Sequence, residues 1–110
     1  MSYQIRITDE ADRDLRGIFA YIAFELSSAQ AAVAQLSRLQ REIEALDDMP
    51  ERYRRYELEP WRSMGVRRFP VDNYCVFYLP DRDRKTVTVL RVLYAARDVD
   101  SIMSAFSTEP

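Results

Sequence analysis

The stretch that decides the fold is residues 65–98, GVRRFPVDNYCVFYLPDRDRKTVTVLRVLYAARD. It contains three runs of β-branched and aromatic residues, separated by Asp72-Asn73 and by the polar segment 81–85. Asn and Asp tolerate positive φ angles, so both short segments suit tight turns between strands. The pattern therefore predicts a three-stranded antiparallel meander.

Upstream of the meander, the chain predicts a strand followed by two helices. Residues 2–7 alternate apolar and polar side chains, as in a half-buried strand. Thr8 is placed to cap a helix over about 9–25, and Ser27-Ser28 to cap a second helix that ends at Met49-Pro50. Each helix carries apolar side chains at spacings of three and four: Ala11, Leu15, Ile18, Phe19, Ile22 and Leu26 in the first, and Ala32, Leu36, Leu39, Ile43 and Leu46 in the second. We expect an antiparallel helical hairpin whose apolar face covers the sheet.

The end of the chain predicts one more helix. Asp98 can cap a short helix whose apolar residues, up to Phe106, again fall at helical spacing. The expected fold is thus α+β: a strand, a helical hairpin, a three-stranded meander and a short C-terminal helix. At 110 residues we expect a single domain over 1–106, followed by a flexible end at 107–110.

Composition excludes several classes of site. Histidine is absent, Cys75 is the single cysteine, and Gly17 and Gly65 are the only glycines. Acid–base chemistry by histidine, a zinc site and a glycine-rich phosphate loop are therefore excluded, and we predict no metal and no cofactor. The sequence also shows no signal peptide and no apolar run of about 18 residues, so we expect a cytoplasmic protein without membrane contact.

Charge is unevenly distributed in this acidic chain of net charge −2. Residues 1–50 carry five arginines and nine carboxylates, whereas residues 52–68 carry six arginines against Glu57 and Glu59. Interleaved arginines and aromatic residues can hold a phosphate backbone and stack on bases. The candidate RNA-binding residues are Arg52, Arg54, Arg55 and Arg62. In the alternative, which we favour for the aromatic residues, Tyr53, Tyr56 and Trp61 anchor a loop whose arginines are solvated.

The meander sequence, together with Met49–Tyr53, resembles the RelE/ParE superfamily, the toxins of type II toxin–antitoxin (plasmid stabilisation) systems. The resemblance extends over roughly residues 3–106. It implies the fold described above and a cognate antitoxin as partner, received in part by the helical hairpin. Residues 1–50, which include the hairpin, carry five arginines against nine carboxylates. This excess of negative charge predicts that the partner carries basic groups.

In RNA-cleaving members of the superfamily, basic side chains on the sheet and near the end of its last strand stabilise the charge on the phosphate. The resemblance therefore implies Arg67, Arg68 and Arg97 as catalytic residues, because a guanidinium binds phosphate oxygens in pairs. Tyr94 stands where many relatives carry histidine, and we favour packing or stacking over acid–base catalysis for it.

Two further positions bear on catalysis. Arg91 and Tyr94 have opposite parity along the last strand, so we expect Arg91 to be a structural ion-pair partner instead. Cys75 occupies a position where RNA-cleaving relatives often carry arginine, and its neighbours indicate a small packed hydrophobic residue. That difference weakens the case for phosphate binding.

Three functions remain open from the sequence. The arginines slightly favour a ribosome-dependent mRNA endonuclease (mRNA interferase), with the ribosome and mRNA as partners. The long hairpin favours a ParE-like inhibitor that poisons DNA gyrase without catalysis. A third reading is a regulatory binding module without toxicity, and a homodimer of the free protein is not excluded by any of them.

Overall fold

The computed structural model describes residues 2–106, so the flexible end expected at 107–110 lies outside the described residues. The strands are β1 (Gln4–Ile7), β2 (Arg67–Val71), β3 (Tyr74–Asp81) and β4 (Thr86–Tyr94). The helices are α1 (Asp9–Ala20), α2 (Ala29–Glu44), α3 (Trp61–Met64) and α4 (Val99–Ala105). None of the helices in this part of the chain is long and apolar enough to cross a membrane.

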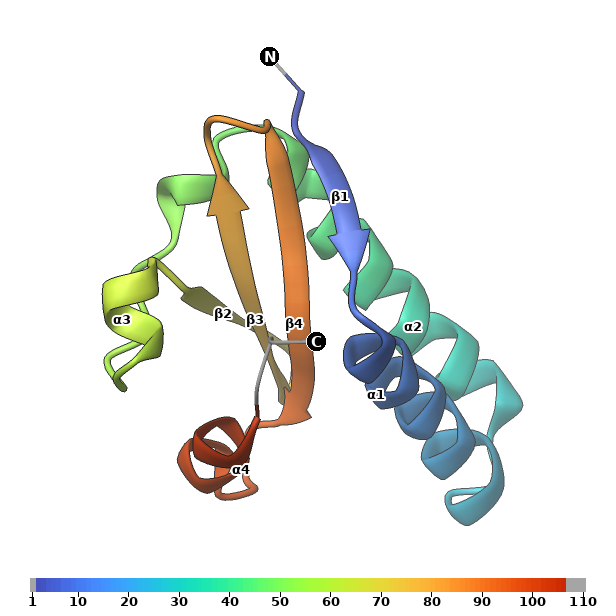
Figure 1. Ribbon diagram of the computed structural model, residues 1–110. Helices are drawn as coiled ribbons and strands as arrows, with labels where there is room; N and C mark the ends of the chain where they lie inside the picture. The colour runs from blue at the N-terminus through green and yellow to red at the C-terminus, as the bar shows by residue number, and fades with distance from the viewer. Residues whose placement is uncertain (1, 107–110) are drawn as a thin grey trace.

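The four strands form one sheet in the order β1-β4-β3-β2. β3 pairs antiparallel with both β2 and β4, which confirms the meander, and β1 pairs parallel with β4 from Gln4 opposite Thr86 to Ile7 opposite Val89. The hairpin α1–α2 lies on one side of the sheet, and α3 and α4 lie on the other (Figure 1). The α+β fold expected from the sequence is confirmed.

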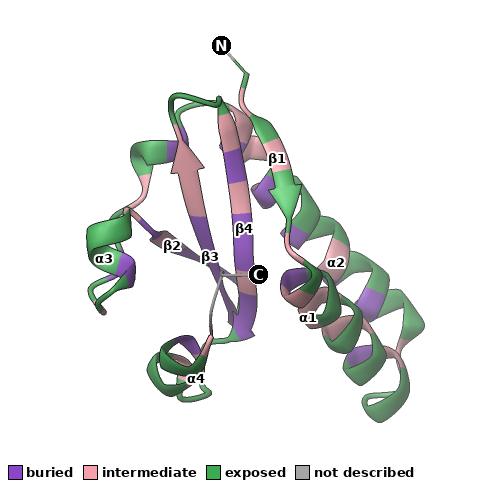
Figure 2. Ribbon diagram, in the orientation of Figure 1, coloured by how far each residue is buried: buried purple, intermediate pink, exposed green. Residues whose placement is uncertain are grey.

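Both faces of the meander are buried, and each has its own core, whereas β1 is mostly exposed (Figure 2). The core under the hairpin contains Ala11, Leu39, Ile43, Leu46, Phe69, Val71, Tyr74, Val76, Tyr78, Val87, Val89 and Val92. The core under α3 and α4 contains Tyr56, Trp61, Val66, Cys75, Phe77, Leu90, Leu93 and Met103. Because both of their faces are covered, β3 and β4 are apolar on both sides, which explains the continuous apolar runs in the sequence.

The first helix does not continue regularly to its expected end. Residues Tyr21–Glu25 form a π-helical turn, and the Leu26 N–H donates to the Tyr21 carbonyl five residues back, at 3.2 Å. The wider turn shifts the following side chains around the axis. The expected place of Leu26 in the apolar stripe is therefore wrong: its side chain is 57% exposed.

The segment between α2 and β2 is more ordered than its sequence indicated, since its apolar residues follow neither helical nor strand spacing. After the 3₁₀ turn Ala45–Asp47 that continues α2, the segment forms two further helical turns, Pro50–Arg52 and α3, which were not predicted from the sequence. Tyr56 and Trp61 are almost fully buried, and the Trp61 indole N–H donates to the Met103 carbonyl at 3.1 Å. These contacts confirm that aromatic residues anchor the segment.

The C-terminal half of β4 extends beyond β1, and α1 covers the edge that remains. The Thr8 hydroxyl donates to the Leu90 carbonyl at 2.8 Å, and the Asp14 carboxylate accepts the Val92 N–H at 2.9 Å. The same carboxylate accepts two hydrogen bonds from the Arg91 guanidinium, at 2.7 and 2.9 Å. Arg91 is therefore a structural ion-pair partner, as its parity predicted. We call Asp14, Arg91 and the Val92 N–H the edge clasp.

Removing the carboxylate of the edge clasp should destabilise the fold strongly. The Asp14 and Arg91 side chains are only 13% and 19% exposed, so Asp14→Ala leaves a half-buried guanidinium and a strand N–H without their acceptor. We expect a loss of about 3–5 kcal/mol in the free energy of unfolding, measured in urea. The matched control, Asp12→Ala, breaks a solvent-exposed pair with Arg16 and should cost less than about 1 kcal/mol. Equal losses in the two variants would contradict the role of the clasp.

Candidate functional site

The arginine-rich segment runs beside the outer edge of β2. Arg55 forms an antiparallel bridge with Arg67. The Arg68 N–H donates to the Arg54 carbonyl at 3.3 Å, and the Tyr56 N–H donates to the Val66 carbonyl at 2.9 Å. This short pairing brings the predicted RNA-binding arginines next to the two arginines of β2.

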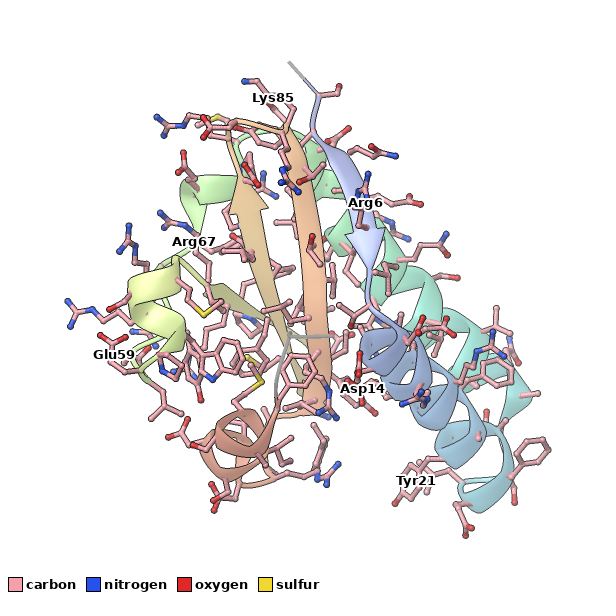
Figure 3. The ribbon with its side chains drawn as sticks, in the orientation of Figure 1. Arg6, Asp14, Tyr21, Glu59, Arg67 and Lys85 are labelled. Atoms are coloured by element: carbon pink, nitrogen blue, oxygen red, sulfur yellow. The ribbon has the colours of Figure 1, made fainter. Side chains whose placement is uncertain are left out.

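Arg67 and Arg68 are consecutive in β2 and therefore point to opposite faces of the sheet. Arg67 lies on the hairpin face, where its Nη1 donates to the Tyr53 carbonyl at 2.6 Å. Tyr53 in turn stacks on Phe69, with the ring centroids 4.3 Å apart. The Arg67 Nε is buried and has no hydrogen-bond partner among the described residues. Arg67 thus holds the loop against the sheet (Figure 3).

Arg68 lies on the other face, with its guanidinium 5.3 Å from the centre of the Tyr56 ring and an ion pair to Glu57 at 3.2 Å. Cys75 is buried on the same face. Burial raises the pKa of the Cys75 thiol, against a smaller opposing effect of Arg68, which disfavours the thiolate. Cys75 is therefore a packed side chain, as its neighbours predicted.

Tyr94 and Arg97 lie at the far end of the sheet from Arg67. Tyr94 pairs with Tyr74 across the strands, and their rings meet edge to face at 5.8 Å. Arg97 follows in the exposed turn before α4. Arg67 pairs with Tyr78, four residues along β3 from Tyr74, which is roughly 13 Å of strand. The three predicted catalytic arginines and Tyr94, the candidate considered for acid–base catalysis, therefore occupy three separate places: Arg67, Arg68, and Tyr94 with Arg97.

The predicted RNA-binding arginines differ in how far they are engaged. Arg52 donates to the Asp48 carbonyl at 2.8 Å and lies 5.0 Å from the Tyr53 ring centre. Arg55 makes a long contact of 3.5 Å with the Arg62 carbonyl. Within residues 2–106, the exposed guanidinium groups of Arg54 and Arg62 make no ion pair and donate no hydrogen bond. A small basic surface of Arg54, Arg55 and Arg62 therefore faces solvent at the β2 edge.

A groove of about 300 Å³ lies between β1 and the helical hairpin. Its lining is Ile5, Ile7, Leu15, Leu36, Gln40, Ile43 and Glu44. Leu15 and Leu36 belong to the apolar stripes expected to cover the sheet, but they line this groove and are only partly buried.

A second apolar surface is the tip of the hairpin, where Tyr21 is seen at the end far from the sheet (Figure 3). The exposed side chains are Tyr21, Phe24, Leu26 and Val33, with Phe24 the most exposed at 76%. Between Tyr21 and Ser37 the only charged residue is Glu25. Exposed apolar side chains without surrounding charge are typical of protein–protein interfaces.

Because Arg67 holds the loop against the sheet, replacing this residue should lower the stability of the protein whether or not Arg67 also contacts a ligand. We expect Arg67→Ala to lower the free energy of unfolding by about 1–3 kcal/mol, since it removes the hydrogen bond to the Tyr53 carbonyl. Arg54→Ala, which removes an exposed arginine of the same segment, should change it by less than about 0.5 kcal/mol. Urea unfolding of both variants checks this, and an unaltered Arg67→Ala protein would show that Arg67 is free for another role.

The buried hydroxyl of Tyr78 should make the protein lose stability at alkaline pH. Its hydroxyl donates to the Pro50 carbonyl at 2.6 Å, and burial raises the pKa of Tyr78 from 10.0 to about 12. The folded state thus favours the neutral phenol; this stabilisation is complete below pH 10 and is lost as the pH rises towards 12. We expect unfolding in urea at pH 8–12 to show a shallower alkaline decline for Tyr78→Phe than for the wild type. Parallel declines would exclude Tyr78 as the titrating group.

Comparison with known proteins now identifies the fold and the family. The Chromosomal ParDE toxin–antitoxin system of P. aeruginosa aligns with a TM-score of 0.70 and 16% identity, covering 84% of this chain and 96% of that one. The RelBE2 toxin–antitoxin complex of Mycobacterium tuberculosis aligns with a TM-score of 0.60 and 22% identity, covering 86% and 99%. A mutant of the E. coli toxin RelE in the free state aligns with a TM-score of 0.60 and 14% identity, covering 96% and 100%. At such identities these similarities establish the fold.

No curated protein sequence matches the chain. The family model described as the ParE toxin of the type II toxin–antitoxin system parDE matches residues 5–99, which include the hairpin and all four strands. The chain therefore belongs to the ParE toxin family of type II toxin–antitoxin systems, within the RelE/ParE superfamily.

Proposed function

We propose that this toxin acts by binding its target, with DNA gyrase as that target, and not by cleaving RNA. The observation that carries the proposal is the separation of the arginines expected to act on a phosphate. Arg67 and Arg68 point to opposite faces of the sheet, and both lie far from Tyr94 along the strands. Attack of an RNA 2′-hydroxyl on its phosphate needs a base, a charge-stabilising group and an acid at one place.

The tyrosines give little support to acid–base chemistry. The Tyr56 hydroxyl donates to Asp100 at 2.5 Å, and burial, reinforced by that carboxylate, raises the pKa of Tyr56 far above its ordinary range. Burial likewise raises the pKa of Tyr74, which lies beside Tyr94. A phenol shifted in this direction keeps its proton near neutral pH and is a poor general base.

The proposal includes a cognate antitoxin as the neutralising partner, met in the cytoplasm. Two of the solved relatives are described as toxin–antitoxin systems or complexes of ParDE and RelBE2, and a third is the archaeal RelE–RelB complex from Pyrococcus horikoshii. The groove and the hairpin tip offer this chain two apolar surfaces for protein partners. We propose that the antitoxin occupies the groove and that the tip contacts the target.

RNA cleavage on the ribosome is the second candidate, and the basic surface of Arg54, Arg55 and Arg62 favours it. Exposed guanidinium groups without carboxylate partners are available to a phosphate backbone. Under this alternative, Arg54, Arg55 and Arg62 would bind mRNA, and Arg68, on the same face as Arg54, would contact the phosphate.

Two assays on the purified protein separate these functions. We expect loss of DNA supercoiling by gyrase, together with intact mRNA in a reconstituted translation reaction. Phe24→Ser changes a side chain that is 76% exposed and should relieve gyrase inhibition without unfolding the protein. Arg54→Ala, which removes one charge of the basic surface, serves as the matched control and should inhibit like the wild type.

The two assays have two further outcomes that would contradict the gyrase proposal. New mRNA ends that appear only with ribosomes, and that Arg54→Ala suppresses, would overturn the gyrase proposal in favour of RNA cleavage. Active gyrase and intact mRNA would point to a binding module without toxicity.

A further inference from the structure

The groove between β1 and the hairpin is apolar except at one rim. Gln40 and Glu44 lie one turn apart on α2, and the Gln40 amide donates to the Glu44 carboxylate at 3.3 Å. The other lining residues are isoleucines and leucines, and Ile7 remains 46% exposed. A segment bound here would place apolar side chains in the groove and bring its backbone or a neighbouring side chain against Glu44.

The Glu44 carboxylate has no cation beside it. Among residues 2–106, no arginine or lysine lies within ion-pairing distance of it. Glu44 is also the last residue of α2, where the partial charge of the helix end is negative and a carboxylate is unfavourable. Residues 42–48 contain three further carboxylates, and the nearby Arg52 donates to the Ala45 carbonyl at 3.3 Å and not to Glu44. The fold therefore places a carboxylate without an ion-pair partner at the edge of an apolar groove.

We propose that Glu44 selects the antitoxin by charge: the segment that fills the groove carries a lysine or arginine that pairs with the Glu44 carboxylate. The inference rests on the proposed antitoxin partner and specifies its chemistry. The apolar lining supplies most of the contact area, and the ion pair at the rim fixes the register of the segment. Like charge at the same position of a non-cognate antitoxin would be rejected.

The shape and charge of the groove favour this occupant over a second copy of the chain. A volume of about 300 Å³ accommodates a few side chains of a peptide segment and is at the small end of ligand sites. β1 is an edge strand of the sheet, so one side of it is open to an extended segment. A second copy would bring another acidic helical half, with five arginines against nine carboxylates in residues 1–50, towards Glu44. Like charges would then oppose the contact.

The test uses the toxin and the product of a small reading frame adjacent to its gene, the expected position of an antitoxin gene. Affinity is measured by calorimetry at low and at high salt for the wild type, Glu44→Gln and Glu44→Lys. We expect the neutral variant to bind roughly five- to tenfold more weakly at low salt, and the charge-reversed variant roughly 100-fold more weakly. High salt should reduce the difference between the wild type and Glu44→Gln, because it screens the ion pair.

Two control variants separate the charge from the groove and from general electrostatics. Asp83→Lys makes the same type of reversal in the exposed β3–β4 turn and should leave affinity unchanged within a factor of two. Ile7→Ser removes a half-exposed apolar contact of the groove and should weaken binding at every salt concentration. Circular dichroism and urea unfolding establish that each variant is folded.

The remaining results distinguish the ion pair, the groove and the antitoxin partnership from one another. Restoration of binding to Glu44→Lys by reversing one lysine or arginine of the partner to glutamate would establish the pair. Loss of binding in Ile7→Ser with no effect at Glu44 would overturn the charge selection and retain the groove as the docking site. Unchanged binding in all variants would place the antitoxin elsewhere and overturn the inference, while the antitoxin partnership itself stands. Failure of the wild type to bind the neighbouring protein would instead reject the proposed partnership.

Discussion

The structure depends on how the uncovered half of β4 is closed. A parallel edge strand of four residues cannot cover a strand of nine, and the N–H and C=O groups that remain would otherwise face solvent or another chain. The start of α1 covers this edge: the Thr8 backbone N–H donates to the Val89 carbonyl at 3.1 Å, and the Thr8 hydroxyl and the Asp14 carboxylate bond to the groups beyond it. Because Asp14 also binds Arg91, one carboxylate joins the hairpin to the sheet and neutralises a half-buried guanidinium. The position of the groove and of the hairpin tip follows from this contact.

The fold could be predicted from the sequence because its local signals agree with one another. The turn at Asp72 adopts positive φ as its residue type allows, and in the structure its carboxylate also accepts hydrogen bonds from Gln35 and Arg38 of α2. The helix caps at Thr8, Ser28 and Asp98 are all present. The π-helical turn, α3 and the parallel pairing of β1 with β4 were not predicted. The first two are set by tertiary packing, and the third joins segments more than 80 residues apart, so none of them leaves a periodic signal.

The candidate site was less accessible to sequence reasoning. Arginines close together in the chain suggested one phosphate site, yet neighbouring residues of a strand face opposite ways, and Arg67 and Arg68 are separated by the sheet itself. The hydrogen bond of Arg67 to a backbone carbonyl could not be predicted either, because carbonyl positions carry no sequence signature. The structural role of Arg91 could be predicted, because the alternation of side chains along a single strand was enough to separate it from Tyr94. The groove could not be located because it forms between a strand and two helices.

The parallel pairing of β1 with β4 also constrains when the protein can become functional. Gln4 pairs with Thr86, so the first strand has no neighbour until most of the chain has been synthesised. Ile5 and Ile7 acquire their places in the groove only when β4 is present beside them. Contacts between such distant segments carry a larger loop-closure cost than those within the local meander and hairpin. A nascent chain on the ribosome therefore lacks the groove, and any partner that binds there can do so only after β4 has emerged and paired with β1.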